Sequence, residues 1–402
     1  MSSVPERPLR VAVVAEFYPS RRDPVLGVWA HRQALAVSRL GVEVRVLVLN
    51  RLVPPRASLA AGPGAALRAL SARAGEPSRQ MRDGLPVSYV PFVSPSRDRH
   101  YPEWGAWAAP SLGVSLLRLR RSFPFDLVHA HNAVPAADAV RLTRSRRPLV
   151  VSVHGGDVLY TARAFPKGAA AVARGLGSAR LALANSQGIA ELALAHGARE
   201  ARVVHLGADM PDRAYGRPPQ DAPTLVTVAH LVARKRQADV LRALAVLRDR
   251  HPRLRYKVVG DGPERGALEA LAARLEVGDR VDFLGQLAPE EALEQARSCT
   301  LFVMPSTEEA FGVAYVEAMA AGVPAIGCRG EPGPEEIAAA GDGFMLVPPG
   351  DIERLSQRID ELLSDPHRLR EAAQRARATV AANFTWEHCG EQTLAAYEDA
   401  LR

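Results

Sequence analysis

Hydrophobic residues recur along the chain in short runs, each followed by a polar loop and then by a segment with apolar positions every three or four residues. The first run, residues 10–15, precedes a helical pattern over residues 28–40, and residues 42–49 form the next run. Such runs predict buried strands, and the patterns between them predict helices that connect the strands. The order strand, helix, strand is typical of a doubly wound α/β unit.

The same alternation begins again after a proline-rich segment. Residues 211–223 have no apolar period, which indicates a linker, and a strand pattern resumes at residues 225–229. A chain of 402 residues is also too long for one typical core. We therefore expect two Rossmann-like domains, residues 1–215 and 216–385, followed by an amphipathic C-terminal helix over residues 386–402.

Two predicted strands of the first half end in histidine. Residues 126–131 end at His131, and residues 149–154 end at His154, with Asp157 shortly after. Ligands gather at the carboxyl ends of strands in open α/β sheets, so two histidines at equivalent ends favour a binding site over two structural histidines. Gly27, in the first loop, either makes a turn or lets the backbone approach a phosphate.

In the second half, an apolar run stops at Pro305 and a helical pattern begins at Val313. The N-terminus of such a helix favours an anion. Glu309 precedes this helix and Glu317 lies inside it, and carboxylates accept hydrogen bonds from the hydroxyls of a polyol. The spacing alone fits two solvated charges as well as it fits a site for a phosphorylated sugar.

Lysine is rare in this chain: Lys167, Lys235 and Lys257 are its lysines among 51 basic residues. Lys235 follows Arg234 between a predicted strand and a predicted helix, where cations can hold a diphosphate. Gly260, in a Gly-Asp-Gly turn after the next strand, is weaker evidence for a phosphate site.

The segment Glu309, Phe311-Gly312, Glu317-Ala318-Met319-Ala320 and Gly322-Val323-Pro324 resembles the E-x7-E motif of retaining glycosyltransferases of the GT-B fold, family 4. Weaker similarity covers nearly the whole chain. The resemblance implies an α/β fold of the GT-B type, with two Rossmann-like doubly wound domains facing a cleft. It implies that residues 1–215 bind the acceptor, that residues 216–385 bind the nucleotide-sugar donor, and that the C-terminal helix returns to the first domain. It also implies transfer of a sugar from a nucleotide diphosphate sugar to an acceptor with retained anomeric configuration, without a metal or a cofactor besides that co-substrate.

The resemblance also implies roles for individual residues. Glu309 would hold the donor sugar near the reacting carbon, Glu317 would hold the ribose hydroxyls, and the backbone at Gly312 and Val313 would meet the diphosphate. The segment that ends at Leu287 would hold the base. The implied catalytic residues are Glu309, Lys235 and His154; the donor-binding residues are Gly27, His230, Arg234, Gly260, Leu287, Ala310, Phe311, Gly312, Val313 and Glu317; the acceptor-side residues are His131 and Asp157.

His230 departs from the family pattern, because it stands where the family has an arginine. Either Arg234 supplies the missing guanidinium, or a neutral imidazole at His230 holds a phosphate more weakly. Two other functions stay open: a nucleotide-sugar epimerase, which would need acid and base carboxylates in the acid-poor first half, and a non-catalytic sugar-nucleotide sensor, which His230 alone suggests.

Charge divides unevenly along the chain, whose net charge is +7. Residues 1–220 hold 30 basic and 15 acidic residues, and residues 221–402 hold 21 and 29. The basic surplus includes segments 51–82 and 97–121, where arginine accompanies Trp104 and Trp107. This mixture suits an anionic membrane surface or an acidic lipid-linked or glycan acceptor, although a solvated helix face would have the same pattern. No nucleic-acid motif accompanies the charge.

The N-terminal residues lack the apolar region of a signal peptide, and no apolar stretch is long enough to cross a bilayer. Three widely spaced cysteines, Cys299, Cys328 and Cys389, show no metal-ligand pattern. We expect a reduced cytoplasmic protein, attached peripherally to the inner face of the cell membrane if its basic half binds lipid.

Overall fold

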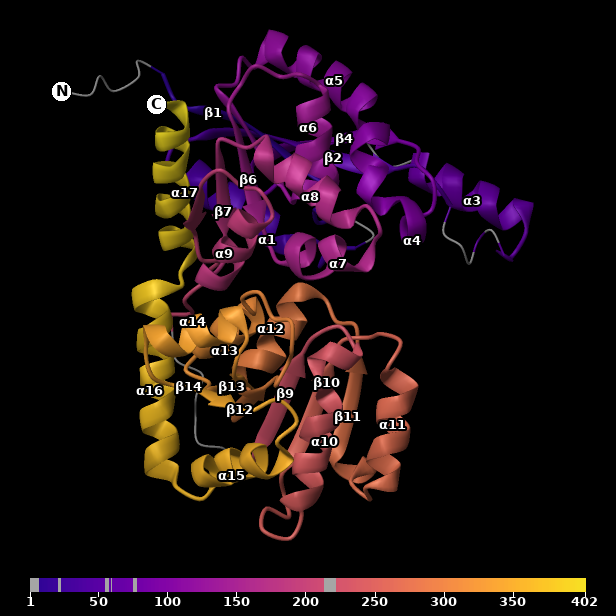
Figure 1. The fold of residues 1–402 in the computed structure, drawn as a ribbon. Helices are drawn as coiled ribbons and strands as arrows, with labels where there is room; N and C mark the ends of the chain where they lie inside the picture. Colours follow the sequence, from indigo (N-terminus) through magenta and orange to yellow (C-terminus); the bar gives the residue numbers. More distant parts are fainter. Residues whose placement is uncertain (1–6, 21–22, 55–57, 59, 75–77, 213–221) are drawn as a thin grey trace, which may run out of the picture. The chain divides into compact units, whose positions relative to one another are not determined.

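The computed structural model describes residues 7–20, 23–54, 58, 60–74, 78–212 and 222–402. The chain forms two compact units (Figure 1): the first comprises Met1–Val204 and Gly390–Arg402, and the second comprises His205–Cys389. The predicted boundary between residues 215 and 216 falls outside the described residues.

The first unit is built on an eight-stranded sheet in the order β3-β4-β2-β1-β5-β6-β7-β8. Only β3 pairs in the antiparallel direction, with β4; the other described pairs are parallel. Because β1 lies between β2 and β5, the strand order reverses at β1, as the doubly wound pattern predicts. The strands are β1 (Arg10–Ala15), β2 (Glu43–Arg51), β3 (Arg79–Arg82), β4 (Leu85–Phe92), β5 (Leu127–His131), β6 (Leu149–Val153), β7 (Leu181–Ala184) and β8 (Ala201–Val203).

Helices surround this sheet, and β1, β5 and β6 form its buried centre because their runs of Val, Leu and Ala leave almost no exposed surface. The helices are α1 (Val28–Arg39), α3 (Pro63–Ala74), α4 (Arg97–His100), α5 (Trp104–Ser122), α6 (Asp138–Leu142), α7 (Ala162–Ala164), α8 (Gly168–Gly177) and α9 (Gln187–Ala195), with short turns η1 (Tyr101–Glu103), η2 (Ala133–Ala137) and η3 (Gly156–Thr161).

The C-terminal helix α17 (Trp386–Leu401) completes the core of the first unit. The hydroxyl oxygen of Tyr397 lies 2.7 Å from Nδ1 of His129. On the other side of the imidazole ring, Nε2 of His129 lies 2.8 Å from Oγ of Ser152. Ser152 donates its proton to Gln33, so His129 donates through Nε2 and accepts the Tyr397 proton at Nδ1. Burial lowers the pKa of His129 to about 3, which keeps it neutral. This network fixes α17 against β5, β6 and α1.

The second unit contains a parallel sheet in the order β11-β10-β9-β12-β13-β14. In chain order this is 3-2-1-4-5-6, the strand order of a Rossmann sheet, so the switch point lies between β9 and β12. The strands are β9 (Thr224–Val228), β10 (Arg255–Val259), β11 (Val281–Gly285), β12 (Leu301–Val303), β13 (Ala325–Cys328) and β14 (Phe344–Val347).

Leu and Val side chains of these strands pack with α10 and α15 into one core, around the fully buried ring of Tyr256. The helices of this unit are α10 (Gln237–Val246), α11 (Arg265–Arg274), α12 (Pro289–Arg297), α13 (Val313–Ala320), α14 (Pro332–Ala340), α15 (Ile352–Leu363) and α16 (Pro366–Asn383), with turns η4 (Ala233–Lys235) and η5 (Gly278–Arg280). Two α/β units, one built on a mainly parallel sheet and the other on a parallel sheet, confirm the predicted fold class. None of the helices in the described parts has the length and apolarity that crossing a membrane requires.

Candidate active site

Lys235 and Glu309 come from two neighbouring strands of the second sheet. Lys235 ends the turn η4, which follows β9, and Glu309 lies in the loop between β12 and α13. Because β9 and β12 are parallel neighbours, their carboxyl ends lie at one edge of the sheet, at its switch point. The topology therefore brings together two residues that are 74 positions apart in the chain.

These two residues form a buried ion pair. Nζ of Lys235 lies 2.5 Å from Oε2 of Glu309, and the two side chains are 12% and 10% exposed. Burial alone would raise the pKa of Glu309, but the charge and hydrogen bond of Lys235 hold that pKa below its ordinary value. Glu309 is therefore ionised at neutral pH although it is buried.

Ser306 holds the Glu309 carboxylate in place, and the hydroxyl of Tyr315 lies beside that of Ser306. Ser306 donates from Oγ to Oε2 of Glu309 at 2.9 Å, and Tyr315 donates to the carbonyl oxygen of Met304. The Tyr315 oxygen lies 3.1 Å from Oγ of Ser306, and burial raises the pKa of Tyr315 well above its ordinary value, so it stays protonated. Sequence reasoning missed both residues, although Ser306 stands three positions before Glu309 and its hydroxyl is a natural donor to that carboxylate.

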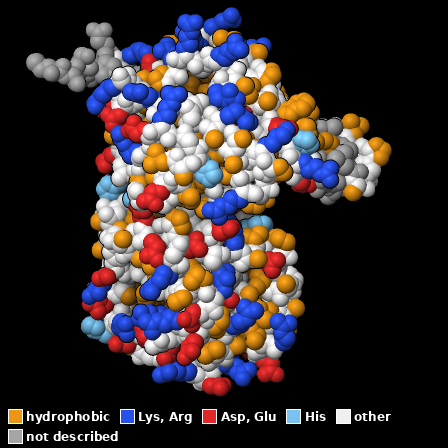
Figure 2. Space-filling model, in the orientation of Figure 1, with side chains coloured by type: hydrophobic (Ala, Val, Ile, Leu, Met, Phe, Trp, Pro, Cys, Tyr) orange, Lys and Arg blue, Asp and Glu red, His pale blue; other side chains and the backbone are white. Residues whose placement is uncertain are grey.

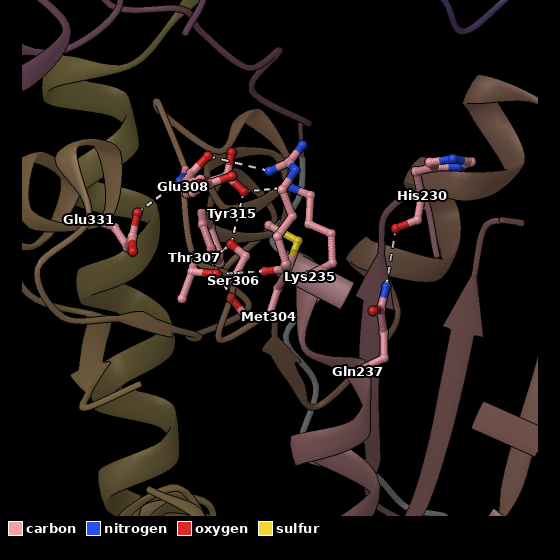
Figure 3. Close-up of polar contacts among 11 residues, drawn as sticks. His230, Lys235, Gln237, Met304, Ser306, Thr307, Glu308, Tyr315 and Glu331 are labelled. Carbon is pink, nitrogen blue, oxygen red and sulfur yellow. Dashed lines mark hydrogen bonds and ion pairs between the residues drawn. The ribbon is translucent and has the colours of Figure 1, made fainter. Parts of the chain in front are cut away.

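The backbone of the loop is fixed from two sides (Figure 3). The Glu309 N–H donates to Oε2 of Glu331 at 2.9 Å, and the Thr307 N–H donates to the carbonyl oxygen of Arg234 at 2.8 Å. Burial raises the pKa of Glu331, and the N–H groups of Glu309 and Glu308 offset part of that rise. Glu331 was also missed, because it reaches the loop from the start of α14 and nothing local in the sequence connects them.

Gly312 sets the direction of α13, because it precedes the helix with a left-handed φ of 90°. A Cβ here would lie 2.3 Å from the Tyr315 ring, so a side chain is excluded. The first N–H groups of a helix have no acceptors within the helix. Helix α13 begins at the half-buried Val313, four residues after Glu309, so its free N–H groups lie at this loop. Glu317 is half-buried one turn further along.

Ala310 and Phe311 point their side chains into the core. The Phe311 ring lies 5.9 Å from that of His205 and 5.6 Å from that of Phe384, and both Ala310 and Phe311 are buried. Their side chains therefore serve packing, and only their backbone groups remain for contact with a ligand.

His230 is exposed, and its ring lies apart from the group around Lys235 (Figure 3). Its carbonyl oxygen accepts a hydrogen bond from Gln237 at 3.4 Å. Arg234 is also exposed, and its guanidinium donates to the carbonyl oxygen of Glu308 at 3.4 Å. Of the two side chains considered for the diphosphate, Arg234 is the one that the structure places beside the Glu309 loop.

Gly260 and Leu287 lie in the loops that follow β10 and β11. Gly260 has a φ of 129°, and a Cβ there would lie 2.0 Å from the carbonyl oxygen of Ala229. Leu287 is half-buried. Close packing of the β9 and β10 loops therefore accounts for glycine at position 260.

In the first unit, His131 and His154 stack with ring centroids 5.2 Å apart, and Nδ1 of His131 lies 3.0 Å from Nε2 of His154. Burial lowers the pKa of His154 to about 3 and that of His131 well below its ordinary value, so the pair is neutral. The other ring nitrogen of each is buried without a hydrogen-bond partner among the described residues. The predicted strand ends thus bring these two histidines together.

Asp157 and Gly27 have local structural roles in the same unit. The Asp157 carboxylate accepts the N–H groups of Ala133 at 2.9 Å and Val134 at 3.2 Å, and the residue is 1% exposed. Its two oxygens therefore hold the turn after β5. Gly27 precedes α1 with a φ of 78°, and a Cβ there would lie 2.2 Å from the Phe17 carbonyl carbon, so it serves the turn.

Comparison with known proteins identifies the class. Residues 26–210 match the model of Glycosyltransferase Family 4, and residues 211–379 match that of Glycosyl transferases group 1. The chain therefore belongs to glycosyltransferase family 4, and its fold is GT-B.

Among individual proteins, the chain is 28% identical to the D-inositol 3-phosphate glycosyltransferase of Rhodococcus jostii over 98% of this chain and 90% of that protein. It is 32% identical to an exopolysaccharide phosphotransferase of Streptomyces coelicolor, over 45% of this chain and only 19% of that protein. Among solved structures, Anabaena HepE in complex with UDP and glucose superimposes with a TM-score of 0.72 and 20% identity, covering 97% of this chain and 100% of HepE. At that identity the likeness shows the fold.

Proposed function

We propose that this protein transfers a sugar from a nucleotide diphosphate sugar to an acceptor with retained anomeric configuration. The observation that carries the proposal is the buried Lys235–Glu309 ion pair at the switch point of the second sheet, beside the N-terminus of α13. Ligands bind at such a point, and a helix N-terminus suits a phosphate.

In this proposal the cations act on the leaving diphosphate. Lys235 has three N–H donors, and one of them points to Glu309. Its remaining donors, together with Arg234 and the first N–H groups of α13, stabilise the negative charge that develops as the glycosidic bond to phosphate breaks. The acceptor hydroxyl bonds to the anomeric carbon on the same face, and its proton passes to the departing phosphate.

Glu309 acts on the sugar. Its carboxylate, held by Lys235 and Ser306, accepts hydrogen bonds from hydroxyls of the donor sugar. The negative charge of that carboxylate faces the positive charge that develops at the reacting carbon. Glu317 holds the ribose hydroxyls. The residues described include no group of three or more His, Cys, Asp or Glu that could hold a metal ion, and the proposed steps use none.

The comparisons support the donor class, because the similar structure of HepE was solved with UDP and glucose. They do not favour an epimerase or a sensor, since the curated relatives named above are a glycosyltransferase and an exopolysaccharide phosphotransferase.

Incubation with radiolabelled nucleotide diphosphate sugars and a membrane-lipid extract tests the proposal. We expect a glycosylated product whose anomeric configuration, read by NMR, is that of the donor. In the same assay the Glu309→Gln variant should form far less product. Glu308→Gln is its matched control, because it makes the same substitution at the exposed neighbouring residue. Release of the free epimer without transfer, or binding without any product, would refute the proposal.

We also propose that α5 docks the first unit on an anionic membrane, where a lipid-linked acceptor would lie. One face of α5 exposes Trp107 (50%), Val114 (47%) and Leu117 (65%). Arg118, Arg120 and Arg121 are exposed at its C-terminal end, and Figure 2 shows Lys and Arg side chains over the end of the first unit that carries α5. Such a stripe of aliphatic and Trp side chains flanked by cations suits an anionic interface.

Trp104, which the sequence placed on the same surface, is 3% exposed and belongs to the core. The guanidinium carbon of Arg51 lies 4.6 Å from the centroid of the Trp104 ring, and the rings of Phe92 and Tyr101 pack edge-to-face with it. Trp104 begins the face of α5 that packs on the sheet, so Trp107 is the aromatic residue that can reach a bilayer.

A further inference from the structure

Helix α14 holds the loop of Glu309 from the side opposite Lys235 (Figure 3). The N–H of Glu309 donates to Oε2 of Glu331 at 2.9 Å, and the carbonyl oxygen of Glu309 accepts from the N–H of Gly333 at 3.1 Å. Gly333 packs so closely that a Cβ there would lie 2.1 Å from Cα of Phe311. The start of α14 therefore engages both backbone groups of Glu309 and packs against the backbone that follows it.

These contacts leave one acceptor atom of Glu309 available. Its Oε2 accepts from Nζ of Lys235 and from Oγ of Ser306, and its backbone N–H and carbonyl oxygen are bound at the start of α14. Within the described part of the chain, Oε1 has no hydrogen-bond partner. Because contacts on both the side chain and the backbone fix this residue, the direction of Oε1 depends on α14 as well as on Lys235.

The turn before Glu309 needs this support. Glu308 has a φ of 54°, in the left-handed region that residues with a Cβ rarely adopt. Successive N–H groups at such a residue form a concavity that binds anions. Burial raises the pKa of Glu331, and the N–H groups of Glu309 and Glu308 lower it, because both favour its charged form. A carboxylate at position 331 thus stabilises the turn that the loop adopts.

A second contact of α14 reaches the same loop through His205. Oε1 of Glu336 lies 2.6 Å from Nε2 of His205, and the His205 ring stacks on that of Phe311 with centroids 5.9 Å apart. The ring of Phe384 packs edge-to-face against both, at 5.1 Å from His205 and 5.6 Å from Phe311. Helix α14 is therefore connected to the loop at two points, directly and through the Phe311 ring.

We infer that Glu331 is a positioning residue for sugar transfer, which holds the backbone of Glu309 so that Oε1 faces the donor sugar. The pair of Glu336 and His205 strengthens the same hold through Phe311. The inference rests on the proposed function, since it takes Glu309 as the group that acts on the sugar. The effect of Glu331 on turnover passes through Glu309.

Loss of Glu331 should lower turnover more than donor affinity. In the proposed function the diphosphate is held by Lys235, Arg234 and the start of α13, which keep their own contacts when Glu331 is removed. Misplacing a catalytic group costs on the order of tenfold to a hundredfold in rate. In Glu331→Ala we therefore expect kcat to fall on this scale while donor Kd changes only a few-fold.

Kinetics and titration calorimetry on the full chain test this expectation, with radiolabelled UDP-glucose and GDP-mannose as donors. Glu331→Gln keeps an acceptor oxygen for the N–H of Glu309, so it should retain more of kcat than Glu331→Ala. In the Glu309→Gln background, Glu331→Ala should lower kcat little further, because a residue that acts through Glu309 has lost its target. Glu291→Ala is the matched control and should leave kcat unchanged, since that carboxylate also accepts one backbone N–H, from Ala288 at 3.2 Å, at the start of α12.

Hydrogen exchange supplies a readout that needs no turnover. The amides of residues 307–309 should exchange faster in Glu331→Ala than in the native protein, because the turn has lost its carboxylate. Melting curves show whether that variant folds. His205→Phe keeps a ring beside Phe311 and loses the hydrogen bond to Glu336, so it repeats the test independently, with a smaller fall in kcat.

Near-native kcat in Glu331→Ala, equal losses of kcat and donor affinity, or a full further fall in the double variant would overturn the inference and leave the proposed function standing. A native protein that moves no sugar from any nucleotide diphosphate sugar would refute the proposed function. Exchange of the loop amides would then still report the hold on Glu309, and unchanged exchange in Glu331→Ala would overturn the inference in either case.

Discussion

Replacing Lys235 with methionine removes the cation and keeps the length of the side chain. In the native protein, Glu309 is 10% exposed and its pKa lies below the ordinary value because of Lys235. Without the cation, burial dominates and the pKa of Glu309 rises. Removing one partner of a buried ion pair costs about 3 kcal/mol or more, because the remaining charge has no compensation.

The sign of the pH dependence follows from these directions. The depressed pKa of Glu309 contributes stability above the unfolded-state value, and that contribution is lost as pH falls through the folded-state pKa. In Lys235→Met that contribution is lost and the raised pKa of Glu309 adds a penalty that grows with pH, so the loss of stability should be smaller at pH 5 than at pH 8. The limit is roughly 1.4 kcal/mol per pH unit for one proton.

Urea unfolding at pH 5 and pH 8 measures this effect. We expect the midpoint of Lys235→Met at pH 8 to fall by about 1 M or more, given slopes of roughly 1–3 kcal/mol per M. Lys257→Met is the matched control, because Lys257 donates to the neutral amide of Gln295 at 2.9 Å. The double variant Lys235→Met/Glu309→Gln should regain most of the lost stability at pH 8. Equal losses at both pH values, or no recovery in the double variant, would refute the reasoning.

Three further predictions concern the donor site and the membrane. Glu317→Gln should weaken donor binding more than turnover, because the ribose hydroxyls lie away from the reacting carbon; a larger fall in kcat than in donor affinity would contradict this. His230→Arg should keep or tighten donor binding in titration calorimetry, whereas Lys235→Ala should weaken it strongly, and the reverse order would place the diphosphate elsewhere. The protein should float with anionic liposomes at low salt but not at high salt, because exposed charges are screened beyond about 8 Å at physiological ionic strength. Replacing Arg118, Arg120 and Arg121 with Ser should reduce flotation, whereas replacing Arg144, Arg146 and Arg147 with Ser should not. Equal flotation with neutral liposomes, or no flotation at either salt, would contradict docking through α5.

Much of the fold could be predicted because the hydrophobic pattern is regular. The runs at residues 10–15 and 301–304 became β1 and β12, and the pattern at residues 28–40 became α1, each within a few residues. The arrangement of the candidate site was predictable where it is local, as at Glu309 and the start of α13. Lys235 was predicted from its type and its place after a strand.

What the sequence could not predict depends on contacts across the fold. Glu331 accepts the N–H of Glu309 from the start of α14, and Tyr315 lies against Ser306 from within α13, so both contacts depend on how these helices pack. Trp104 and Trp107 are three residues apart on one helix, and only the packing of α5 shows that one is buried and the other exposed. The carboxylate of Glu16, which follows β1, accepts hydrogen bonds from Arg97 and Tyr101, and the sequence did not predict this group because both partners are more than 80 positions away.

The kinetics of Glu309→Gln test the central claim most directly. Glutamine keeps the shape and loses the charge that faces the reacting carbon, so kcat for donor turnover should fall by at least a hundredfold, the scale of roughly 3–4 kcal/mol for a group that acts in the transition state. Donor Kd, measured by titration calorimetry on the same preparation, should change by only a few-fold, and Glu308→Gln should leave both quantities near their native values. A Glu309→Gln protein with near-native kcat would contradict the assignment of this ion pair as the site of sugar transfer.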